Sequence, residues 1–472
     1  MVDFSRGGAR RLTVWGAALA AALVVTAGTL LGHSGVAGAG KHRVAADGQF
    51  LKAISAPVKL RAPGDPQEIR FDISCLPPDG DVDGPGVCDG AGTVYFRTSG
   101  GVTAAVPLTL DPNAQVGRYV AVVPPAIWSS PVFTYYAAIR DNTTGNSVLV
   151  PPGGSSAPQI SFATGASMID LGSHVFRTTR VASARVAGAS WGSGDRQVGL
   201  EDGVDMPTGA SAFDVDSSGD VYLFDEANGR MLEFAPGGPV QAIPLPGLSG
   251  EKGDLRVSDT TGTAYVLEVA DAASQQPLLR SYSLQGSALS SSPVADDAAA
   301  QVRLSGSTAF VSEYPSSMWA PVLQANGRAP VDPSSQLSRA FPGAPAQDGN
   351  VVVTSTGSEI RVGTYAASGA TYQFSTVRIA SSTPVADIQL AQKLPSGRLL
   401  VVFSVYTDAD HEYEAVVADL SSGNLVDRFS LPASEWAQSM PLSRFRLVGT
   451  SLYELGSTDQ GAFVDRYDLG VS

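Results

Sequence analysis

Short apolar segments recur along the C-terminal part of the chain at intervals of 42 to 53 residues. Polar stretches rich in Gly, Ser and Asp separate one segment from the next. Short apolar runs bounded by turn residues are typical of buried β-strands. The pattern therefore predicts one β-structured unit per interval. The six segments begin at Val221, Ala264, Ala309, Val351, Leu399 and Leu452.

A repeat of this length that is built from strands predicts a β-propeller, in which each repeat forms one blade. The six segments then provide the central strands of six blades within residues 164–472. A seventh blade arises if residues 171–200 form a sheet of their own. We expect instead that residues 175–177 and 181–186 complete the last blade, because closing the ring removes exposed sheet edges.

A different pattern precedes the repeats, in residues 50–163. Apolar and polar residues alternate along residues 69–75 and 133–139, which gives each segment one buried face. Residues 141–145 read Asp-Asn-Thr-Thr-Gly, a hairpin turn, and 151–158 have the Pro/Gly/Ser composition of a linker. Several short strands in so few residues predict a β-sandwich. The expected fold class of the folded part is therefore all-β.

Two segments resemble known families. Residues 207–234 carry a Pro-Gly lead, an Asp-containing strand, a Gly turn, a Val-Tyr strand, and then Asp, Asn and Arg before an aromatic strand. This segment resembles an NHL-type repeat, which implies a propeller blade, whereas the other five repeats keep only the apolar skeleton. Residues 133–146 resemble the late strands of bacterial immunoglobulin-like or fibronectin-III-like surface domains, which implies an Ig-like sandwich.

The N-terminus has the layout of a targeting segment. A basic tip (residues 1–11) precedes an uncharged stretch (12–32), and a Gly/Ala-rich tether (33–49) follows. Positive charge before an apolar run keeps the tip cytoplasmic and sends the rest of the chain across the membrane. The stretch is long enough to span as a single-pass transmembrane helix of the cell membrane. Alternatively it is a signal peptide cleaved near residues 37–39, and the protein is secreted.

The net charge and the cysteines give further expectations about the partners and the compartment of the protein. The net charge is −14, and an acidic surface repels phosphate, so nucleic acid is not an expected partner. Cys75 and Cys88, the two cysteines, lie close together in the sequence. In an extracytoplasmic compartment such a pair is expected to form one local disulfide, rather than two free thiols.

Residues suited to catalysis are few. The predicted domains contain two histidines, His174 near the domain junction and His411 in an acidic stretch that reads as a solvated hairpin loop. Ser190 lies in a Gly-x-Ser-x-Gly pattern, but a nucleophile elbow needs a helix after the serine. Gly-Ser-Gly-Asp follows instead. We therefore assign no catalytic residue from the sequence.

Two acidic stretches have the spacing of calcium ligands, because calcium prefers clustered carboxylate and carbonyl oxygens. Calcium is the one cofactor that the sequence suggests, and the alternatives are an ordinary blade turn and a solvated acidic loop. The candidate metal ligands are Asp214, Asp216, Ser218 and Asp225 in the first repeat, and Asp79, Asp81, Asp83 and Asp89 in the sandwich.

These observations favour a membrane-tethered, extracytoplasmic protein with a non-catalytic binding or scaffolding role at the cell envelope. Its expected ligand is a protein, a peptide or a glycan. The alternative is a propeller enzyme, such as a metal-dependent lactonase-like hydrolase. A cluster of acidic residues, Asn or His on the inner strands of several blades would favour the enzyme.

Overall fold

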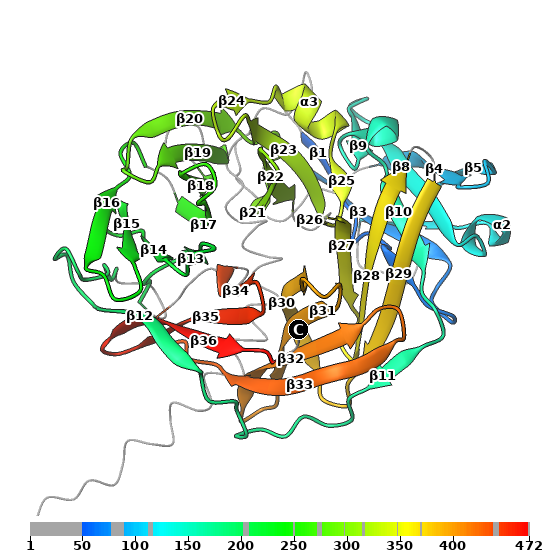
Figure 1. Cartoon of the computed structure of the whole chain (residues 1–472). Helices are drawn as coiled ribbons and strands as arrows, with labels where there is room; N and C mark the ends of the chain where they lie inside the picture. Colours follow the sequence, from blue (N-terminus) through cyan, green and yellow to red (C-terminus); the bar gives the residue numbers. More distant parts are fainter. Residues whose placement is uncertain are drawn as a thin grey trace, which may run out of the picture.

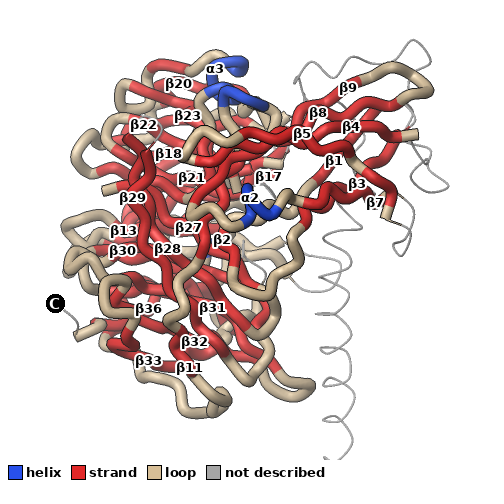
Figure 2. Tube along the Cα trace, turned by 90° about the vertical axis from the view of Figure 1, so that its right-hand side faces the viewer, coloured by secondary structure: helices blue, strands red, loops and turns tan. Residues whose placement is uncertain are grey.

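The computed structural model describes residues 50–76, 89–111, 117–201, 207–248, 251–270, 276–296, 298–313, 317–346, 348–368, 371–437 and 443–470. The regular secondary structure of the described residues is almost entirely β-strand, which confirms the predicted all-β fold class. Its sheets are arranged as a ring with a smaller two-sheet body attached at one side (Figures 1 and 2).

The smaller body is a β-sandwich. One sheet has the order β1-β3-β7-β6, and the other has the order β2-β10-β8-β4-β5 with β9 paired to β8. A short helix, α2 (Pro125–Trp128), connects the two sheets. The strands are β1 (Phe50–Ile54), β2 (Leu60–Arg61), β3 (Glu68–Leu76), β4 (Gly90–Thr98), β5 (Thr103–Pro107), β6 (Thr109–Leu110), β7 (Arg118–Val122), β8 (Val132–Asp141), β9 (Ser147–Val150) and β10 (Gln159–Ala163).

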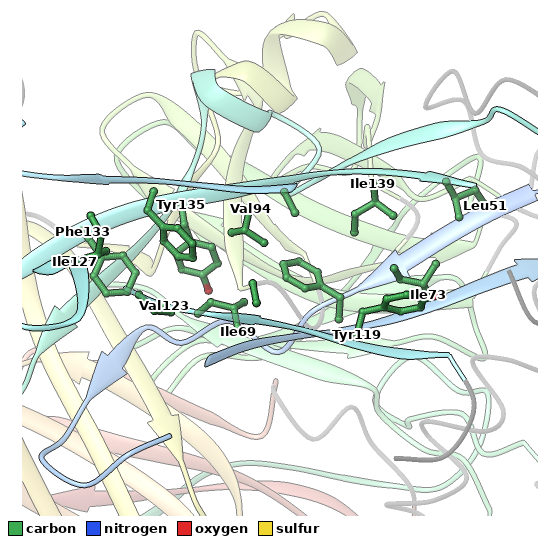
Figure 3. Packing of buried hydrophobic residues seen from close by; sticks show 14 of the residues in the cluster. Leu51, Ile69, Ile73, Val94, Tyr119, Val123, Ile127, Phe133, Tyr135 and Ile139 are labelled. Carbon is green, nitrogen blue, oxygen red and sulfur yellow. The ribbon is translucent and has the colours of Figure 1, made fainter. Parts of the chain in front are cut away.

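The core of the sandwich follows the alternation seen in the sequence. Phe133, Tyr135 and Ile139 on β8 meet Ile69 and Ile73 on β3 between the two sheets (Figure 3). All five side chains are buried. Because successive residues of a strand point to opposite faces, the same alternation leaves the outer face of the β4–β8 sheet polar and aromatic.

The ring consists of six sheets among the described residues, and we number these blades 1 to 6 in chain order (Figure 1). Blade 1 contains β13 (Ala212–Val215), β14 (Val221–Asp225), β15 (Arg230–Phe234) and β16 (Val240–Pro244). Blade 2 contains β17 (Glu251–Ser258), β18 (Thr263–Ala270), β19 (Leu278–Ser283) and β20 (Ala288–Pro293). Blade 3 contains β21 (Ala299–Ser305), β22 (Thr308–Glu313), β23 (Met318–Gln324), β24 (Ala329–Pro330) and β25 (Phe341–Pro342), with the helix α3 (Pro333–Ser338) at its edge.

Blades 4 and 6 take one strand from the chain that precedes blade 1. Blade 4 contains β26 (Ala344–Ala346), β27 (Gly349–Ser355), β28 (Glu359–Ser368), β29 (Thr371–Ala380) and the early β11 (Met168–Asp170). Blade 5 contains β30 (Val385–Lys393), β31 (Leu399–Tyr406), β32 (His411–Asp419) and β33 (Asn424–Pro432). Blade 6 contains β34 (Phe445–Val448), β35 (Ser451–Thr458), β36 (Gly461–Asp468) and the early β12 (Ala184–Ser190).

The chain therefore runs along the outer edges of three blades before it begins the ring. It pairs with β29 as β11, makes a bridge from Thr179 to Ser430 in blade 5, and pairs with β36 as β12. The expectation that residues 181–186 complete the last blade is confirmed in part, because β12 begins at Ala184 and pairs with β36. The same expectation for residues 175–177 was wrong, because the N–H of Arg177 donates to Glu412 of blade 5. The pairing of β12 with β36 joins the start of the domain to its end and so closes the ring.

Blade 4 departs from the predicted register. The repeat pattern placed Val351 on a central strand. Val351 instead lies on β27, the strand that precedes the central strand β28 and pairs with it. The prediction was wrong because β27 is as apolar at Val351 and Val352 as a central strand, and both residues are buried. Apolar content alone does not distinguish two neighbouring buried strands of one sheet.

The sandwich is joined to blade 4 by an apolar contact and an ion pair. Phe162 on β10 packs against Tyr365 and Phe374 of blade 4, with ring centroids 5.0 and 5.1 Å apart. Beside them, the buried Arg361 of β28 pairs with Asp65 of the sandwich, 2.8 Å from Arg361 Nη2 to Asp65 Oδ1. Together these contacts fix the sandwich against one side of the ring.

The predicted membrane segment, residues 12–32, and its flanks lie outside the described residues. Within the part of the chain that the structure describes, no helix is both long and apolar enough to span a bilayer.

Candidate functional site

Five charged side chains on the innermost strands of blades 1, 2, 3 and 6 interact near the axis of the ring. We call them the axial cluster. Inner strands β13, β17, β21 and β34 are neighbours in the ring, so side chains from different blades meet there. The cluster consists of Asp214 on β13, Asp254 and Arg256 on β17, Arg303 on β21, and Arg446 on β34.

Asp254 is the hub of the cluster and is fully buried. Its Oδ1 accepts hydrogen bonds from Arg446 Nη2 at 2.6 Å and from Ser443 Oγ at 2.8 Å, both from the blade 6 side. Its Oδ2 accepts a hydrogen bond from the backbone N–H of Val302 in blade 3 at 2.8 Å. One carboxylate on blade 2 thus connects blades 3 and 6 across the axis.

Asp214 makes the second set of contacts. Its Oδ2 accepts the backbone N–H of Val257 at 2.7 Å, and its Oδ1 lies 3.3 Å from Arg256 Nη1 and 3.6 Å from Arg446 Nε. Arg256 also donates from Nε to the carbonyl of Val302. The remaining nitrogen of Arg256, Nη2, is buried and has no hydrogen-bond partner.

The cluster carries more positive than negative charge. Three arginines face two aspartates, which leaves one excess positive charge (3 − 2 = 1). The one hydrogen bond of the Arg303 side chain among the described residues is from Nη1 to Gln392 Oε1, at 3.5 Å. Burial lowers the pKa of Arg303, and the charges of Arg256 and Arg446 lower it further. Burial and the charge of Arg256 likewise lower the pKa of Arg446 to about 10.

This arrangement is suited to binding an anion. A buried charge is costly unless it is paired, and an arginine with free N–H groups matches carboxylate and phosphate oxygens. The unpartnered Arg256 Nη2 and the weakly held Arg303 supply such donors. The sequence contained a signal for this site, because the first strands of blades 2, 3 and 6 each contain an arginine. The sequence did not reveal that these arginines meet.

The acidic residues predicted to bind calcium in blade 1 are not brought together. Asp214 belongs to the axial cluster. Asp216 caps the β13–β14 turn by accepting the N–H groups of Ser218 and Asp220 at 2.9 Å, and Ser218 itself is exposed. Asp225 has different partners. The described residues contain no group of three or more His, Cys, Asp or Glu side chains placed to hold a metal ion.

Asp225 is fully buried and joins the central hairpin of blade 1 to the preceding loop. Its carboxylate accepts hydrogen bonds from Arg230 Nε at 2.7 Å, from Asn228 Nδ2 at 2.8 Å and from the N–H of Gly199 at 2.8 Å. The Asp, Asn and Arg of the sequence pattern thus hold one turn of the blade. Their part in the structure is stabilisation of that turn.

The second predicted calcium loop falls mainly outside the described residues, which do not include Asp79, Asp81, Asp83 or Cys88. Asp89 is described and exposed, and its backbone carbonyl accepts the N–H of Asn142. Cys75 is buried on β3, and no described cysteine is a free thiol. The pairing of Cys75 with Cys88 and calcium binding in this loop stay predictions.

His174 fastens the chain before blade 1 to blade 5. The buried ring lies between two glutamates of β32, with Nδ1 3.1 Å from Glu414 Oε2 and Nε2 2.9 Å from Glu412 Oε2. Burial on its own lowers the pKa of His174, but the hydrogen bonds and charges of Glu414 and Glu412 outweigh it, and the pKa is raised. The role of this histidine is therefore structural.

The other two residues considered for catalysis, His411 and Ser190, lie at the ends of two strands. His411 is the first residue of β32 and is partly buried against Tyr413, so the interpretation of a solvated loop was wrong. Burial lowers the pKa of His411. Ser190 is exposed at the end of β12, and a bridge at Trp191 follows rather than a helix. Ser190 therefore lacks the geometry of a nucleophile elbow.

A buried carboxyl group between blades 5 and 6 was not found from the sequence. Glu454 on β35 is 2% exposed, and its Oε2 accepts a hydrogen bond from the Tyr467 hydroxyl at 3.0 Å. Burial raises the pKa of Glu454 to about 8. The alternation of β35 placed this residue on a buried face, but the depth of burial, whose effect on the pKa outweighs the charge of Arg444, is a property of the packing.

Comparisons with known proteins do not assign a family. No family model and no curated protein sequence matches the chain. Among solved structures, virginiamycin B lyase from Staphylococcus aureus is 10% identical, covering 55% of this chain and 95% of its own, with a TM-score of 0.34. A putative 6-phosphogluconolactonase from Bacteroides uniformis is 14% identical, covering 54% of this chain and 76% of its own, with a TM-score of 0.28.

A protein from Lactobacillus plantarum is 11% identical, covering 73% of this chain and 97% of its own, with a TM-score of 0.31. These similarities are too low to say anything about activity. The propeller architecture rests on the order of strands in the six sheets.

Proposed function

We propose that this chain is a non-catalytic binding protein whose propeller binds an anionic group at the axial cluster. The observation that carries the proposal is the excess positive charge, together with the buried, unpartnered Nη2 of Arg256. An anion that pairs with Arg256 and Arg303 balances the charge that the two aspartates leave uncompensated. The ligand is a carboxylate or phosphate compound, or the acidic side chain or terminus of a peptide.

We also propose the membrane topology and the disulfide that the sequence predicts. The protein is anchored through residues 12–32, the Ig-like sandwich and propeller are extracytoplasmic, and Cys75 is linked to Cys88. Protease added to intact cells is expected to digest the sandwich and propeller. Full protection of both domains by the membrane would contradict this topology.

The alternative, a metal-dependent hydrolase, would use inner-strand carboxylates to hold a cation. Asp214 and Asp254 are instead within ion-pair distance of Arg256 and Arg446. A cation placed there would have to displace two arginines. This pairing favours an anion over a cation at the axis.

The test is isothermal titration of the full-length protein with phosphate, sulfate and acetate at constant ionic strength. Saturable binding of at least one oxyanion is expected. Arg303→Gln removes the excess charge, so this variant should lose anion binding. It should also melt at a higher temperature than the wild type in anion-free buffer, because less like charge is buried. If the substitution only disrupted the fold, the variant would instead melt at a lower temperature than the wild type.

Arg328→Gln is the matched control, since Arg328 is exposed on the turn after β23, away from the axis. This variant is expected to bind oxyanions as the wild type does. The proposal fails if no oxyanion binds saturably, or if Arg303→Gln and Arg328→Gln bind equally well.

A further inference from the structure

The open face of the sandwich carries a groove that is separate from the axial cluster. Its volume is about 450 Å³, and it lies over the outer face of the β4, β5 and β8 strands, beside the connection between β9 and β10. The residues that shape it include Tyr95 and Arg97 on β4, Thr134 and Tyr136 on β8, and Pro158 directly before β10. A groove of this size suits a small ring-shaped ligand, because pockets for such ligands span about 300–1,000 Å³.

The floor of the groove carries a stacked pair of tyrosine rings, which we call the aromatic platform. Tyr95 and Tyr136 face each other across paired strands, and their rings are stacked with centroids 5.0 Å apart and planes 19° apart. Tyr95 is 40% exposed. Its neighbour on the other side, Ala105 of β5, is small and does not cover the ring. Stacked rings that stay open to water offer an apolar surface to another flat, partly apolar group.

Polar groups at the edge of the platform are free to bind. The guanidinium of Arg97 and the hydroxyls of Tyr95 and Tyr136 make no hydrogen bond or ion pair with the described residues. Arg97 is the one charged residue among those that line the groove. The groove is therefore locally positive on a protein whose net charge is −14. Its charge is complementary to an acidic ligand.

We propose that this groove binds an acidic saccharide. One pyranose ring stacks through its C–H face on the face of Tyr95 that points away from Tyr136, and its carboxylate or phosphate pairs with Arg97. The ring hydroxyls meet the tyrosine hydroxyls and Thr134. The stacked tyrosines and the single arginine of the lining favour a sugar that carries one acidic group.

The experiment compares oligogalacturonate with its methyl ester, which has the same rings but no charge, by titration into the full-length protein. The acid is expected to bind at least about tenfold more tightly than the ester. Arg97→Gln should remove this preference, because the positive charge is lost. Tyr95→Ala should weaken binding of both compounds by about tenfold, whereas Tyr95→Phe should retain most of it.

Leu110→Ala is the control, because Leu110 is exposed on the other sheet of the sandwich. Tyr95→Ala should weaken saccharide binding by the same factor in the Arg303→Gln background as in the wild type, which separates this groove from the axial cluster. The inference is wrong if neither compound binds, or if Tyr95→Ala and Leu110→Ala bind equally. Selection of peptides whose binding requires Tyr95, with no saccharide bound, would also overturn it.

Discussion

Replacing Asp254 by asparagine removes the negative charge that connects blades 2, 3 and 6. In the wild type this fully buried carboxylate accepts hydrogen bonds from Arg446, Ser443 and the backbone of Val302. In Asp254→Asn the three arginines of the axial cluster face Asp214 alone, so the excess positive charge of the cluster rises from one to two (3 − 1 = 2).

The cost follows from the burial of these groups. Removing one partner of a buried ion pair leaves an uncompensated charge and costs about 3–5 kcal/mol. An exposed pair contributes no more than about 1 kcal/mol. Asp468→Asn is the matched control in blade 6, because Asp468 pairs with Arg466 at 3.1 Å while both side chains stay exposed (53% and 37%).

The assay is guanidinium-induced unfolding of the full-length protein, followed by tryptophan fluorescence. Asp254→Asn should lower the free energy of unfolding by about 3–5 kcal/mol, and Asp468→Asn by less than about 1 kcal/mol. The double variant Asp254→Asn/Arg446→Gln should recover part of the loss, because the charge left unpaired is removed as well. If Asp254→Asn is no less stable than Asp468→Asn, the axial cluster does not stabilise the ring.

Three further changes test other parts of the propeller. The pKa of His174 is raised in the folded state. The ion pairs of this histidine therefore stabilise the protein fully below the unfolded pKa, and this stabilisation is lost as the pH rises through the folded pKa. His174→Gln should remove this pH dependence in thermal melts. The pKa of Glu454 is about 8 in the folded protein, so this carboxyl group stays protonated below that pH. The wild type should therefore lose stability as the pH rises from the unfolded pKa of the group towards 8. Glu454→Gln should abolish that loss. A side chain at Gly461 would collide with the backbone of β12, so Gly461→Ala should increase hydrogen exchange along β12. Gly188→Ala is the control, because the added carbon has room there and hydrogen exchange should not change. Unchanged pH profiles, or equal exchange in the two glycine variants, would contradict these assignments.

The sequence determined the fold class and most strand positions, because strand burial follows from local alternation and apolar content. The alternating residues of β8 fill the sandwich core as predicted, and five of the six repeat segments are central strands of blades. Val351 is the exception. A neighbouring strand of the same sheet is equally buried, so local pattern does not separate the two.

Tertiary structure alone decided which charged side chains meet. Asp214, Asp216 and Asp225 have the spacing of a calcium loop, yet strand alternation and the turn send them to three different sets of partners. Arg303 and Arg446 are distant in sequence and meet only because the ring brings the first strands of blades 3 and 6 to one axis.

The same reason explains the groove on the sandwich. Tyr95 and Tyr136 lie on strands whose pairing register is set by the whole sheet, and their stacking depends on that register. A sequence fixes which residues a strand presents on each face, through interactions between near neighbours. Which strands pair within a sheet and how the sheets pack together depend on the whole fold, and these two features create the groove and the axial cluster respectively.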